Sequence, residues 1–297
     1  MEYTKLNLHI TENCNYNCKH CFSKFDSIED SSLKQWKTII ANIQSKLKVD
    51  EFNIAGGEPF CSSLFLPLVE HIYQLGIKCS LITNGLLMNE KWIMENIKYF
   101  SMIGFSIDSF DYNTINTIGR MDRNNRFLSF DKFKSLIKKI KELNPNCKIK
   151  VNTVVNKENF TENIYKELKL LHQYIDKWKI LKMKCHKNDN FSNLHLDITM
   201  EEYKKFIQTN LGNNFDIDIT SPCSEKKYIH NTEVIIEKEL KNAYFIIDPH
   251  GKLLDNSNLD HKVYFDFANL NGCEDIDLLS LLTTTKVINE ELYKSRY

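Results

Sequence analysis

Short apolar or alternating segments of this chain are separated by longer stretches in which apolar residues recur at helical spacing, and the alternation repeats about six times. Strand-like segments lie at 6–11, 51–55, 77–83, 102–108, 148–155 and 178–183. Helical spacing begins near residue 31 and recurs at 64–75, 89–99, 131–143 and 163–174. Alternating strands and helices are typical of a parallel sheet, so we predict an α/β fold, a partial (β/α)6 barrel similar to a TIM barrel.

The rhythm changes after about residue 185. Polar segments separate a helix predicted at 200–209 from a hairpin predicted at 243–248 and 252–255, with Pro249, His250 and Gly251 in its turn. No low-complexity linker precedes this region. We therefore expect residues 1–184 to form the barrel core and residues 185–297 to form a C-terminal extension that caps or flanks the barrel and its substrate site.

The composition is that of a globular protein. Hydrophobic residues make up 42% and charged residues 26% of the 297 residues, which argues against a disordered chain or a coiled coil. The formal net charge is zero, so no general basic excess indicates a nucleic acid or a membrane surface as a partner. The chain has neither the ~18 to 20 successive apolar residues of a membrane span nor a secretory signal, and we expect a cytoplasmic protein.

Nine cysteines in a chain without an export signal favour metal ligation or reactive thiols over disulfides. Cys14, Cys18 and Cys21 stand in CNYNCKHCF, directly after the first predicted strand, where active-site groups collect in α/β barrels. A cubane iron–sulfur cluster or a structural zinc site held by protein alone takes four ligands, and this segment offers three. His20 is a poor fourth ligand because it adjoins Cys21. The metal centre would therefore keep one open coordination position.

A second motif, GGEP, follows the second predicted strand. Gly56 and Gly57 would let the backbone approach a ligand closely, and Glu58 can accept hydrogen bonds from an ammonium group. By itself this motif also fits an ordinary glycine turn. Polar residues recur near the carboxyl ends of the other strands, where buried parallel strands would otherwise be apolar, and this indicates one pocket at the top of the barrel.

The cysteine spacing, with Tyr16 between the first two cysteines and Phe22 after the third, resembles the cluster-binding motif of the radical S-adenosylmethionine (SAM) superfamily. GGEP resembles the superfamily's contact to the SAM amino group. The resemblance implies a [4Fe–4S] cluster held by Cys14, Cys18 and Cys21, a partial barrel of the radical SAM type, and an open iron bound by SAM. Reduction of the cluster would cleave SAM to a 5′-deoxyadenosyl radical. The plainer interpretation is a zinc site completed by a distant Cys or His.

Longer segments, covering most of the chain, resemble the viperin family of antiviral nucleotide dehydratases. They include LNLHITENCNYNCKHCF, FNIAGGEPF, ITNG, SIDSFDYNTINTIGR, KVNTVVN, KWKILK and NAYFIIDPHGKLLDN. The resemblance implies a lyase that converts a ribonucleoside triphosphate, CTP before UTP or GTP, to its 3′-deoxy-3′,4′-didehydro form. The radical would take the hydrogen from ribose C4′, and the 3′-hydroxyl would leave as water. Such products terminate viral RNA chains, and the electron donor implied is a flavodoxin or ferredoxin.

Matched by position, the resemblance also implies two ligand sites. The SAM site would be lined by Tyr16, Phe22, Gly56, Gly57, Glu58, Asn84, Ser106 and Asp108. The nucleotide site would be lined by Asn7, Asn53, Arg120, Lys150, Asn152, Lys179 and Lys182. Guanidinium and ammonium groups suit a triphosphate because they neutralise its oxygens and donate hydrogen bonds to them. Taken singly, each charge fits a solvated surface residue, and Asp108 fits a helix cap.

Two departures from the animal enzymes fall where nucleotide contacts are expected. Glu51 stands where those enzymes have a lysine, and Ala55 where they have a serine. A carboxylate near phosphate is unfavourable, so Glu51 points away, a neighbour such as Lys182 replaces the charge, or the substrate differs. The amphipathic membrane helix of the animal proteins and their terminal tryptophan are absent, which predicts a soluble, prokaryotic-type member.

Two other functions stay open. One is a radical SAM maturase that modifies a ribosomal peptide, although no cysteine-rich C-terminal extension of the kind common in such enzymes is seen. The other is a non-catalytic iron–sulfur or zinc protein, which GGEP and the polar strand ends disfavour. The remaining cysteines are scattered, and Cys79 is expected in the core because it falls in a predicted strand.

Overall fold

The computed structural model describes residues 5–21, 23, 30–185, 187–188, 191–213, 215, 217–218, 224–238, 245–254 and 263–269. Its strands are β1 (Lys5–His9), β2 (Glu51–Ala55), β3 (Lys78–Thr83), β4 (Met102–Ser106), β5 (Lys148–Val155), β6 (Lys177–Lys182), β7 (Lys187–Asn188), β8 (Phe191–Ser192), β9 (Glu225–Ile229), β10 (Thr232–Glu237), β11 (Phe245–Ile247), β12 (Lys252–Leu254) and β13 (Val263–Asp266). The α-helices are α1 (Leu33–Lys46), α2 (Phe65–Gln74), α3 (Glu90–Asn96), α4 (Tyr112–Thr117), α5 (Phe130–Leu143), α6 (Tyr165–Leu168) and α7 (Met200–Leu211). Short 3₁₀ turns are η1 (Pro59–Cys61), η2 (Ile97–Tyr99), η3 (Lys169–Leu171) and η4 (Leu194–Leu196).

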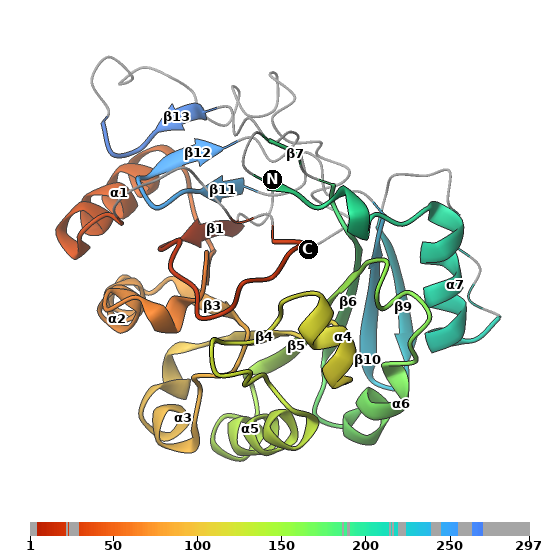
Figure 1. Ribbon diagram of the computed structural model, residues 1–297. Coiled ribbons are helices and arrows are strands. Elements are labelled where there is room, and N and C mark those ends of the chain that lie inside the picture. The colour runs from red at the N-terminus through yellow and green to blue at the C-terminus, as the bar shows by residue number, and fades with distance from the viewer. Residues whose placement is uncertain are drawn as a thin grey trace.

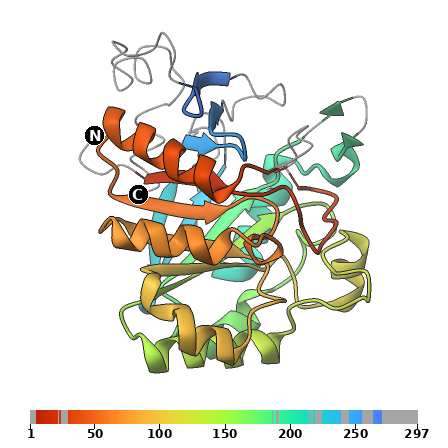
Figure 2. The ribbon, with the colours of Figure 1, turned by 90° about the vertical axis from the view of Figure 1, so that its left-hand side faces the viewer.

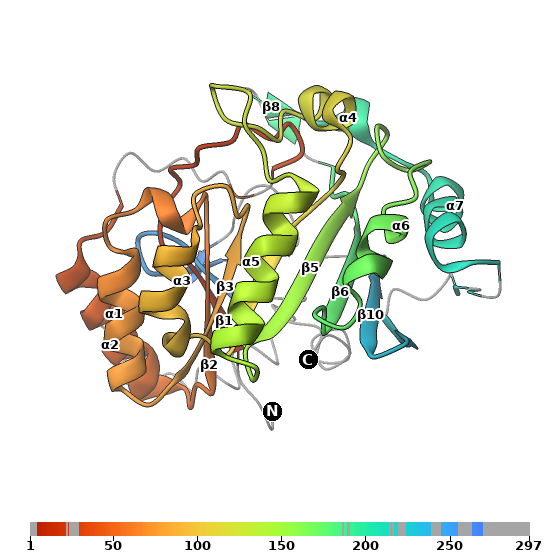
Figure 3. The same ribbon diagram turned by 90° about the horizontal axis from the view of Figure 1, so that it is seen from below.

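An 11-stranded sheet in the order β13-β12-β11-β1-β2-β3-β4-β5-β6-β10-β9 curves around the centre of the molecule (Figure 1). The strands β1 to β6 are parallel neighbours in chain order. Helices lie on the outer side of the strands, with α3 and α5 seen there in Figure 3 and α1 beside α2 in Figure 2. This arrangement confirms the predicted α/β fold with a partial barrel. Among the described residues, no helix is both long and apolar enough to cross a membrane.

Two periodicities in the sequence build the outer layer. Along each barrel strand, every second side chain is apolar and buried against the helices, as are Leu6, Leu8, Ile103 and Phe105. Each helix buries a stripe at 3.6-residue spacing, which in α1 consists of Trp36, Ile39, Ile40 and Ile43. The other face of each strand points into the barrel, and that inner face carries the polar residues described below.

The C-terminal region contributes strands to both edges of this sheet. β10 lies parallel to β6 and is followed by the edge strand β9, and on the other side β11 lies parallel to β1 and is followed by β12 and the edge strand β13. The helix expected at 200–209 is confirmed by α7, and the hairpin is confirmed by antiparallel β11 and β12, with residues 243–244 and 255 outside the described residues. The division between 1–184 and 185–297 stays a prediction.

The sequence periodicity does not predict α4, β9 or β10, and it predicts one helix that is too long. α4 lies in a segment rich in Asn and Thr, and it begins where Asp111 accepts a hydrogen bond from Thr114 N–H at 3.0 Å. β9 and β10 form an antiparallel pair. The glutamates of β10 pair with lysines of β6, and the local sequence does not show these partners. The helix expected at 163–174 is shorter, consisting of α6 and η3.

The end of α4 holds the cysteine loop, residues 10–21. Lys19 N–H donates to the Ile118 carbonyl at 2.9 Å, and Figure 3 shows the red segment after β1 reaching α4. Gly119 has a φ of +70°, and a Cβ there would lie 2.5 Å from the Asn17 carbonyl oxygen. Glycine is therefore needed twice over, for the backbone conformation and for the close approach.

This geometry predicts that Gly119→Ala destabilises the chain more than Gly76→Ala does. Gly76 is a matched control, because its φ is +72° but nothing lies within 4 Å of the added Cβ. Both variants carry the backbone strain of about 1 kcal/mol, and the first adds a clash with backbone that cannot move freely. Urea denaturation should show an additional loss of about 1 kcal/mol or more for Gly119→Ala. Equal losses would mean that the loop yields without cost.

Candidate functional site

The three cysteines of CNYNCKHCF lie in the cysteine loop at the carboxyl end of β1. Tyr16 N–H donates to Cys14 Sγ at 3.4 Å, and Cys21 N–H donates to the Cys18 carbonyl at 3.2 Å. All three cysteine side chains line one cavity. In the described part of the chain, no three His, Cys, Asp or Glu side chains surround a single metal-ion position. The ligands of a cubane cluster bind different irons, so their sulfurs need not meet at one point.

Gly56 and Gly57 bring the end of β2 against the cysteine loop. A Cβ on Gly57 would lie 2.3 Å from the Asn13 carbonyl oxygen, and one on Gly56, whose φ is +125°, would lie 2.5 Å from the Thr11 carbonyl oxygen. Gly57 N–H donates to that Thr11 oxygen at 2.7 Å, and Glu58 N–H donates to the Asn13 carbonyl at 2.8 Å. From the sequence, these glycines are expected to let the backbone approach a ligand. In the structure they let it approach the backbone of the cysteine loop, and they thereby fix the shape of that loop.

Glu58 is buried, with 1% of its surface exposed, and it lies at the cavity wall. Its Oε1 accepts hydrogen bonds from Thr83 Oγ1 at 2.7 Å and from Phe60 N–H at 3.4 Å, and its Oε2 accepts one from Asn84 N–H at 2.7 Å. Burial raises the pKa of Glu58 to about 7, although these hydrogen bonds lower it in part. A hydrogen-bond donor arriving from the cavity would favour the ionised carboxylate.

A cavity of about 700 Å³ runs along the inside of the barrel. Sequence-predicted residues that line it are Asn7, Cys14, Tyr16, Cys18, Cys21, Asn53, Gly56, Gly57, Glu58, Asn84, Ser106, Asp108, Arg120, Lys150, Asn152 and Lys179. The lining also includes Lys5, Lys78 and Lys148, the first residues of β1, β3 and β5. The polar residues therefore extend along the whole height of the barrel, and the expectation that they gather at the carboxyl ends of the strands is too narrow.

At the cysteine end of the cavity, Asn84 and Tyr16 tie neighbouring loops together. Asn84 Nδ2 donates to Asn15 Oδ1 at 2.7 Å, and the Tyr16 hydroxyl accepts a hydrogen bond from Leu128 N–H at 3.1 Å. Burial raises the pKa of the Tyr16 hydroxyl well above its ordinary range, so the phenol stays neutral. Both residues hold the rim of the cavity beside the cysteines.

Arg120 lies at the cysteine end too, away from the lysines of the inner strands. Its Nη1 is 2.9 Å from Asp108 Oδ2 and 3.7 Å from Cys18 Sγ, and its Nη2 donates to the Ser106 carbonyl at 2.9 Å. His20 Nε2 approaches the same Asp108 oxygen at 3.1 Å. Burial opposes ionisation of Asp108, but Arg120 and His20 outweigh it and hold the pKa of that carboxyl below its ordinary value.

Glu51 points into the cavity, and a neighbour different from the one expected neutralises it. Lys5 forms a buried ion pair with Glu51, and the Ser80 hydroxyl donates to the same carboxylate. Asn53 continues this network through Nδ2, which donates to Asn7 Oδ1 at 2.8 Å. Glu51 therefore does not turn away, and the compensating charge comes from Lys5 and not from Lys182. The remaining alternative, a different substrate, stays a prediction.

The lysines of β5 and β6 differ in their partners. Lys177 pairs with Glu233 at 2.8 Å, and Lys179 forms a buried ion pair with Glu237. Within the described part of the chain, no acidic side chain lies within ion-pair distance of Lys150. Burial, together with the neighbouring cations Lys179 and Lys5, holds the pKa of Lys150 well below its ordinary value. An anion in the cavity would therefore find Lys150 without a carboxylate competing for it.

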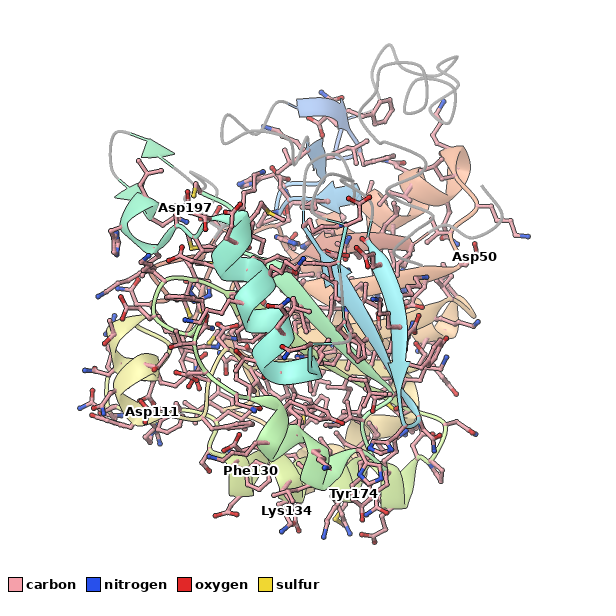
Figure 4. The ribbon with its side chains drawn as sticks, turned by 90° about the vertical axis from the view of Figure 1, so that its right-hand side faces the viewer. Asp50, Asp111, Phe130, Lys134, Tyr174 and Asp197 are labelled. Atoms are coloured by element: carbon pink, nitrogen blue, oxygen red, sulfur yellow. The ribbon has the colours of Figure 1, made fainter. Side chains whose placement is uncertain are left out.

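One predicted residue does not join this group, and a second lies outside the described residues. Lys182 is absent from the described cavity lining, and its Nζ lies 3.3 Å from Asp197 Oδ1, just before α7 (Figure 4). Phe22 lies outside the described residues. Sequence reasoning missed Lys5, Lys177 and Lys184, which line the cavity. Lys5 and Lys177 occupy the first positions of strands whose inward faces are polar, so the period of two would have found them.

Comparison with known proteins places this geometry in a family. The model of the radical SAM superfamily matches residues 8–171. An S-adenosylmethionine-dependent nucleotide dehydratase of Selenomonas ruminantium is 35% identical, over 87% of this chain and 88% of that protein. The chain belongs to the radical SAM superfamily and to the family of these dehydratases. A protein of the same name from Fibrobacter sp. (strain UWH6) is 29% identical, over 98% of this chain and 87% of that protein.

A solved structure supports the same fold. Native anSMEcpe with bound AdoMet superposes with a TM-score of 0.64 at 16% identity, over 95% of this chain and 81% of that chain. The cofactors of a radical SAM enzyme are a [4Fe–4S] cluster and SAM. The residues present fit them, because three cysteine side chains line one cavity together with the buried carboxylate of Glu58, and Cys14 is exposed.

The raised pKa of Glu58 predicts a pH-dependent stability of the metal-free chain. Between its ordinary value of 4.5 and about 7, the unfolded chain loses this proton before the folded chain does, so the stabilisation present below 4.5 declines as the pH rises. The decline amounts to about 3 kcal/mol, because each tenfold difference in proton affinity between the folded and unfolded chain corresponds to about 1.4 kcal/mol. The free energy of unfolding of the natural chain, relative to Glu58→Gln, should fall by that order from pH 4.5 to 8.

Urea denaturation at both pH values under reducing conditions measures this difference. A difference that stays constant would mean that the three hydrogen bonds already keep Glu58 ionised.

Proposed function

We propose that this protein is a nucleotide dehydratase that converts a ribonucleoside triphosphate, with CTP favoured over UTP and GTP, to the 3′-deoxy-3′,4′-didehydro nucleotide. The observation that carries the proposal is one continuous cavity with the cysteines at one end and buried lysines along its inner strands. The names of the relatives at 35% and 29% identity support the nucleotide as the substrate class. Such a product lacks the 3′-hydroxyl needed for chain extension, in keeping with an antiviral role.

The residues divide between two ligands. SAM would be held by Tyr16, Phe22, Gly56, Gly57, Glu58, Asn84, Ser106 and Asp108. The nucleotide would be held by Asn7, Asn53, Lys150, Asn152 and Lys179. The reduced cluster and SAM supply hydrogen-atom abstraction from an unactivated carbon. The role of the chain is then to hold ribose C4′ toward the cysteine end while the triphosphate extends toward the lysines.

Lys150 would be the main phosphate ligand. Its ammonium faces the cavity without an acidic partner among the described residues, and a phosphate oxygen would favour its charged form by pairing with it. Asn152 has its Oδ1 buried without a hydrogen-bond partner among the described residues, which suits a ribose hydroxyl or a bound water as donor. Lys5 would keep Glu51 from repelling the phosphates.

An external donor must supply the electron, and we propose a protein of the flavodoxin or ferredoxin type. Cys14 and Lys19 are exposed in the cysteine loop, so a partner can approach the cluster position from outside the barrel. A positive side chain at that surface would suit an acidic donor protein.

The direct test is an anaerobic assay of the iron-reconstituted protein with SAM, dithionite and each of CTP, UTP, GTP and ATP, followed by mass spectrometry. We expect one triphosphate to become lighter by one water while 5′-deoxyadenosine forms. Slow release of 5′-deoxyadenosine that no triphosphate changes would contradict the substrate. A ribosomal peptide would then be the next substrate to examine.

The lysine geometry predicts a contrast between Lys150→Met and Lys182→Met. Lys150→Met removes a cation from the cavity, so the KM for the triphosphate should rise about tenfold or more, as loss of a hydrogen bond to a charged group predicts. Lys182→Met removes a cation that pairs with Asp197 outside the cavity lining, and the KM should stay within about twofold.

Iron content and nucleotide-free cleavage of SAM serve as controls, and both variants should match the natural chain. Equal KM values for Lys150→Met and the natural chain would show that the phosphates lie elsewhere.

A further inference from the structure

A single guanidinium lies between the cysteine loop and the strand ends. Arg120 is 8% exposed, and its two terminal nitrogens make three contacts: to Cys18 Sγ at 3.7 Å, to Asp108 Oδ2 at 2.9 Å and to the Ser106 carbonyl at 2.9 Å. Matching by position assigns Arg120 to the nucleotide site. The structure places its charge beside a cysteine that holds the cluster instead.

The surroundings of Arg120 fix it there. Asp108 is fully buried, and its other oxygen accepts a hydrogen bond from Val154 N–H at 2.7 Å. If the guanidinium turned toward a phosphate instead, the buried Oδ2 of Asp108 would keep only His20 as a neighbouring cation among the described residues. Removing one partner of a buried ion pair is strongly destabilising, so Arg120 is held on the cysteine side.

A cation at this place bears on the redox chemistry of the cluster. A hydrogen bond and a positive charge at a ligand sulfur stabilise the more negative, reduced cluster, and the effect is large in a site shielded from water. Asp108 places the opposite charge next to the same guanidinium. The two residues therefore act on the same quantity with opposite sign.

We propose that Arg120 is a positioning residue that raises the reduction potential of the cluster through Cys18. Asp108 holds Arg120 in place, and its negative charge partly offsets the effect of Arg120 on the potential. The inference rests on membership of the radical SAM superfamily and does not depend on the identity of the substrate. Its consequence is that the ease of reduction is set by the IGR segment after α4, and not by the cysteine loop alone.

The test is a potentiometric titration of the reconstituted protein without SAM or nucleotide, with dithionite as the electron donor and the EPR signal of the reduced cluster as the readout. Arg120→Gln keeps a hydrogen-bond donor and removes the charge, so its midpoint potential should be more negative than that of the natural chain. Arg126→Gln is the matched control. Its guanidinium follows on the same segment, is 63% exposed and pairs with Asp122, so the potential should not move.

Asp108→Asn supplies the second arm and should shift the potential in the positive direction. A general loosening of the site would move both variants the same way, so opposite shifts support the proposal and shifts of the same sign overturn it. An unchanged potential for Arg120→Gln at full iron content also overturns it, and a weakened KM for the triphosphate in that variant would return Arg120 to the nucleotide site. If Arg120→Gln fails to retain iron, the sign of the Asp108→Asn shift decides.

The nucleotide assay stays independent of this result. A chain that converts no triphosphate can still show the predicted pair of shifts, and an active dehydratase can fail to show them.

Discussion

Charge buried inside the barrel is the constraint on which the rest of the structure depends. An inner face that carries lysines is stable only if each ammonium meets a carboxylate or keeps access to water. The strands meet this need in pairs drawn from distant parts of the chain: Lys5 with Glu51, Lys177 with Glu233 and Lys179 with Glu237. The pairs across β6 and β10 explain why a C-terminal strand must dock at that edge, because β10 brings both glutamates.

The paired charges also define what the cavity can receive. A lysine that is already paired with a carboxylate contributes little free energy to the binding of another anion, because that anion must compete with the carboxylate. Lys150 differs, because its neighbours Lys179 and Lys5 are cations and burial disfavours its own charge. A polyanion bound beside Lys150 would relieve the repulsion among the lysines and would also accept new hydrogen bonds from them. The barrel concentrates this repulsion at Lys150 because Lys5, Lys177 and Lys179 are compensated.

The sequence is sufficient for the parts that local pattern controls. The period of two on the outer strand faces and the 3.6-residue stripes predict the six strand-and-helix units, and CNYNCKHCF with GGEP predicts where the cysteine end lies. Long-range pairing is what the pattern cannot supply. The local sequence shows no partner for the two glutamates of TEVIIE, and only the pairing of β10 with β6 brings Lys177 and Lys179 to them. From the sequence alone, the carboxylate of Glu51 is expected to repel a phosphate. Its charge is compensated by Lys5, which is 46 residues away in the chain, and only the fold shows this pairing. Arg120 has the residue type of a phosphate ligand, and its contacts to Asp108 and Cys18 cannot be predicted from the local sequence.

At the cysteine end of the cavity, two glycines fix the position of the cysteine loop. The backbone of the cysteine loop contacts Gly57 at Asn13 and Gly119 at Asn17. Both contacts are so close that a Cβ on either glycine would clash with a carbonyl oxygen of the loop. The loop that presents Cys14, Cys18 and Cys21 is therefore clamped between the end of β2 and the end of α4, and it cannot move without disturbing both. Because Glu58 and Arg120 directly follow these two glycines, the same clamps that fix the thiols also fix a carboxylate and a guanidinium beside them. Two steric requirements at one edge of the sheet thus create a charged setting for the cluster, while the inner lysines act separately on the other end of the cavity.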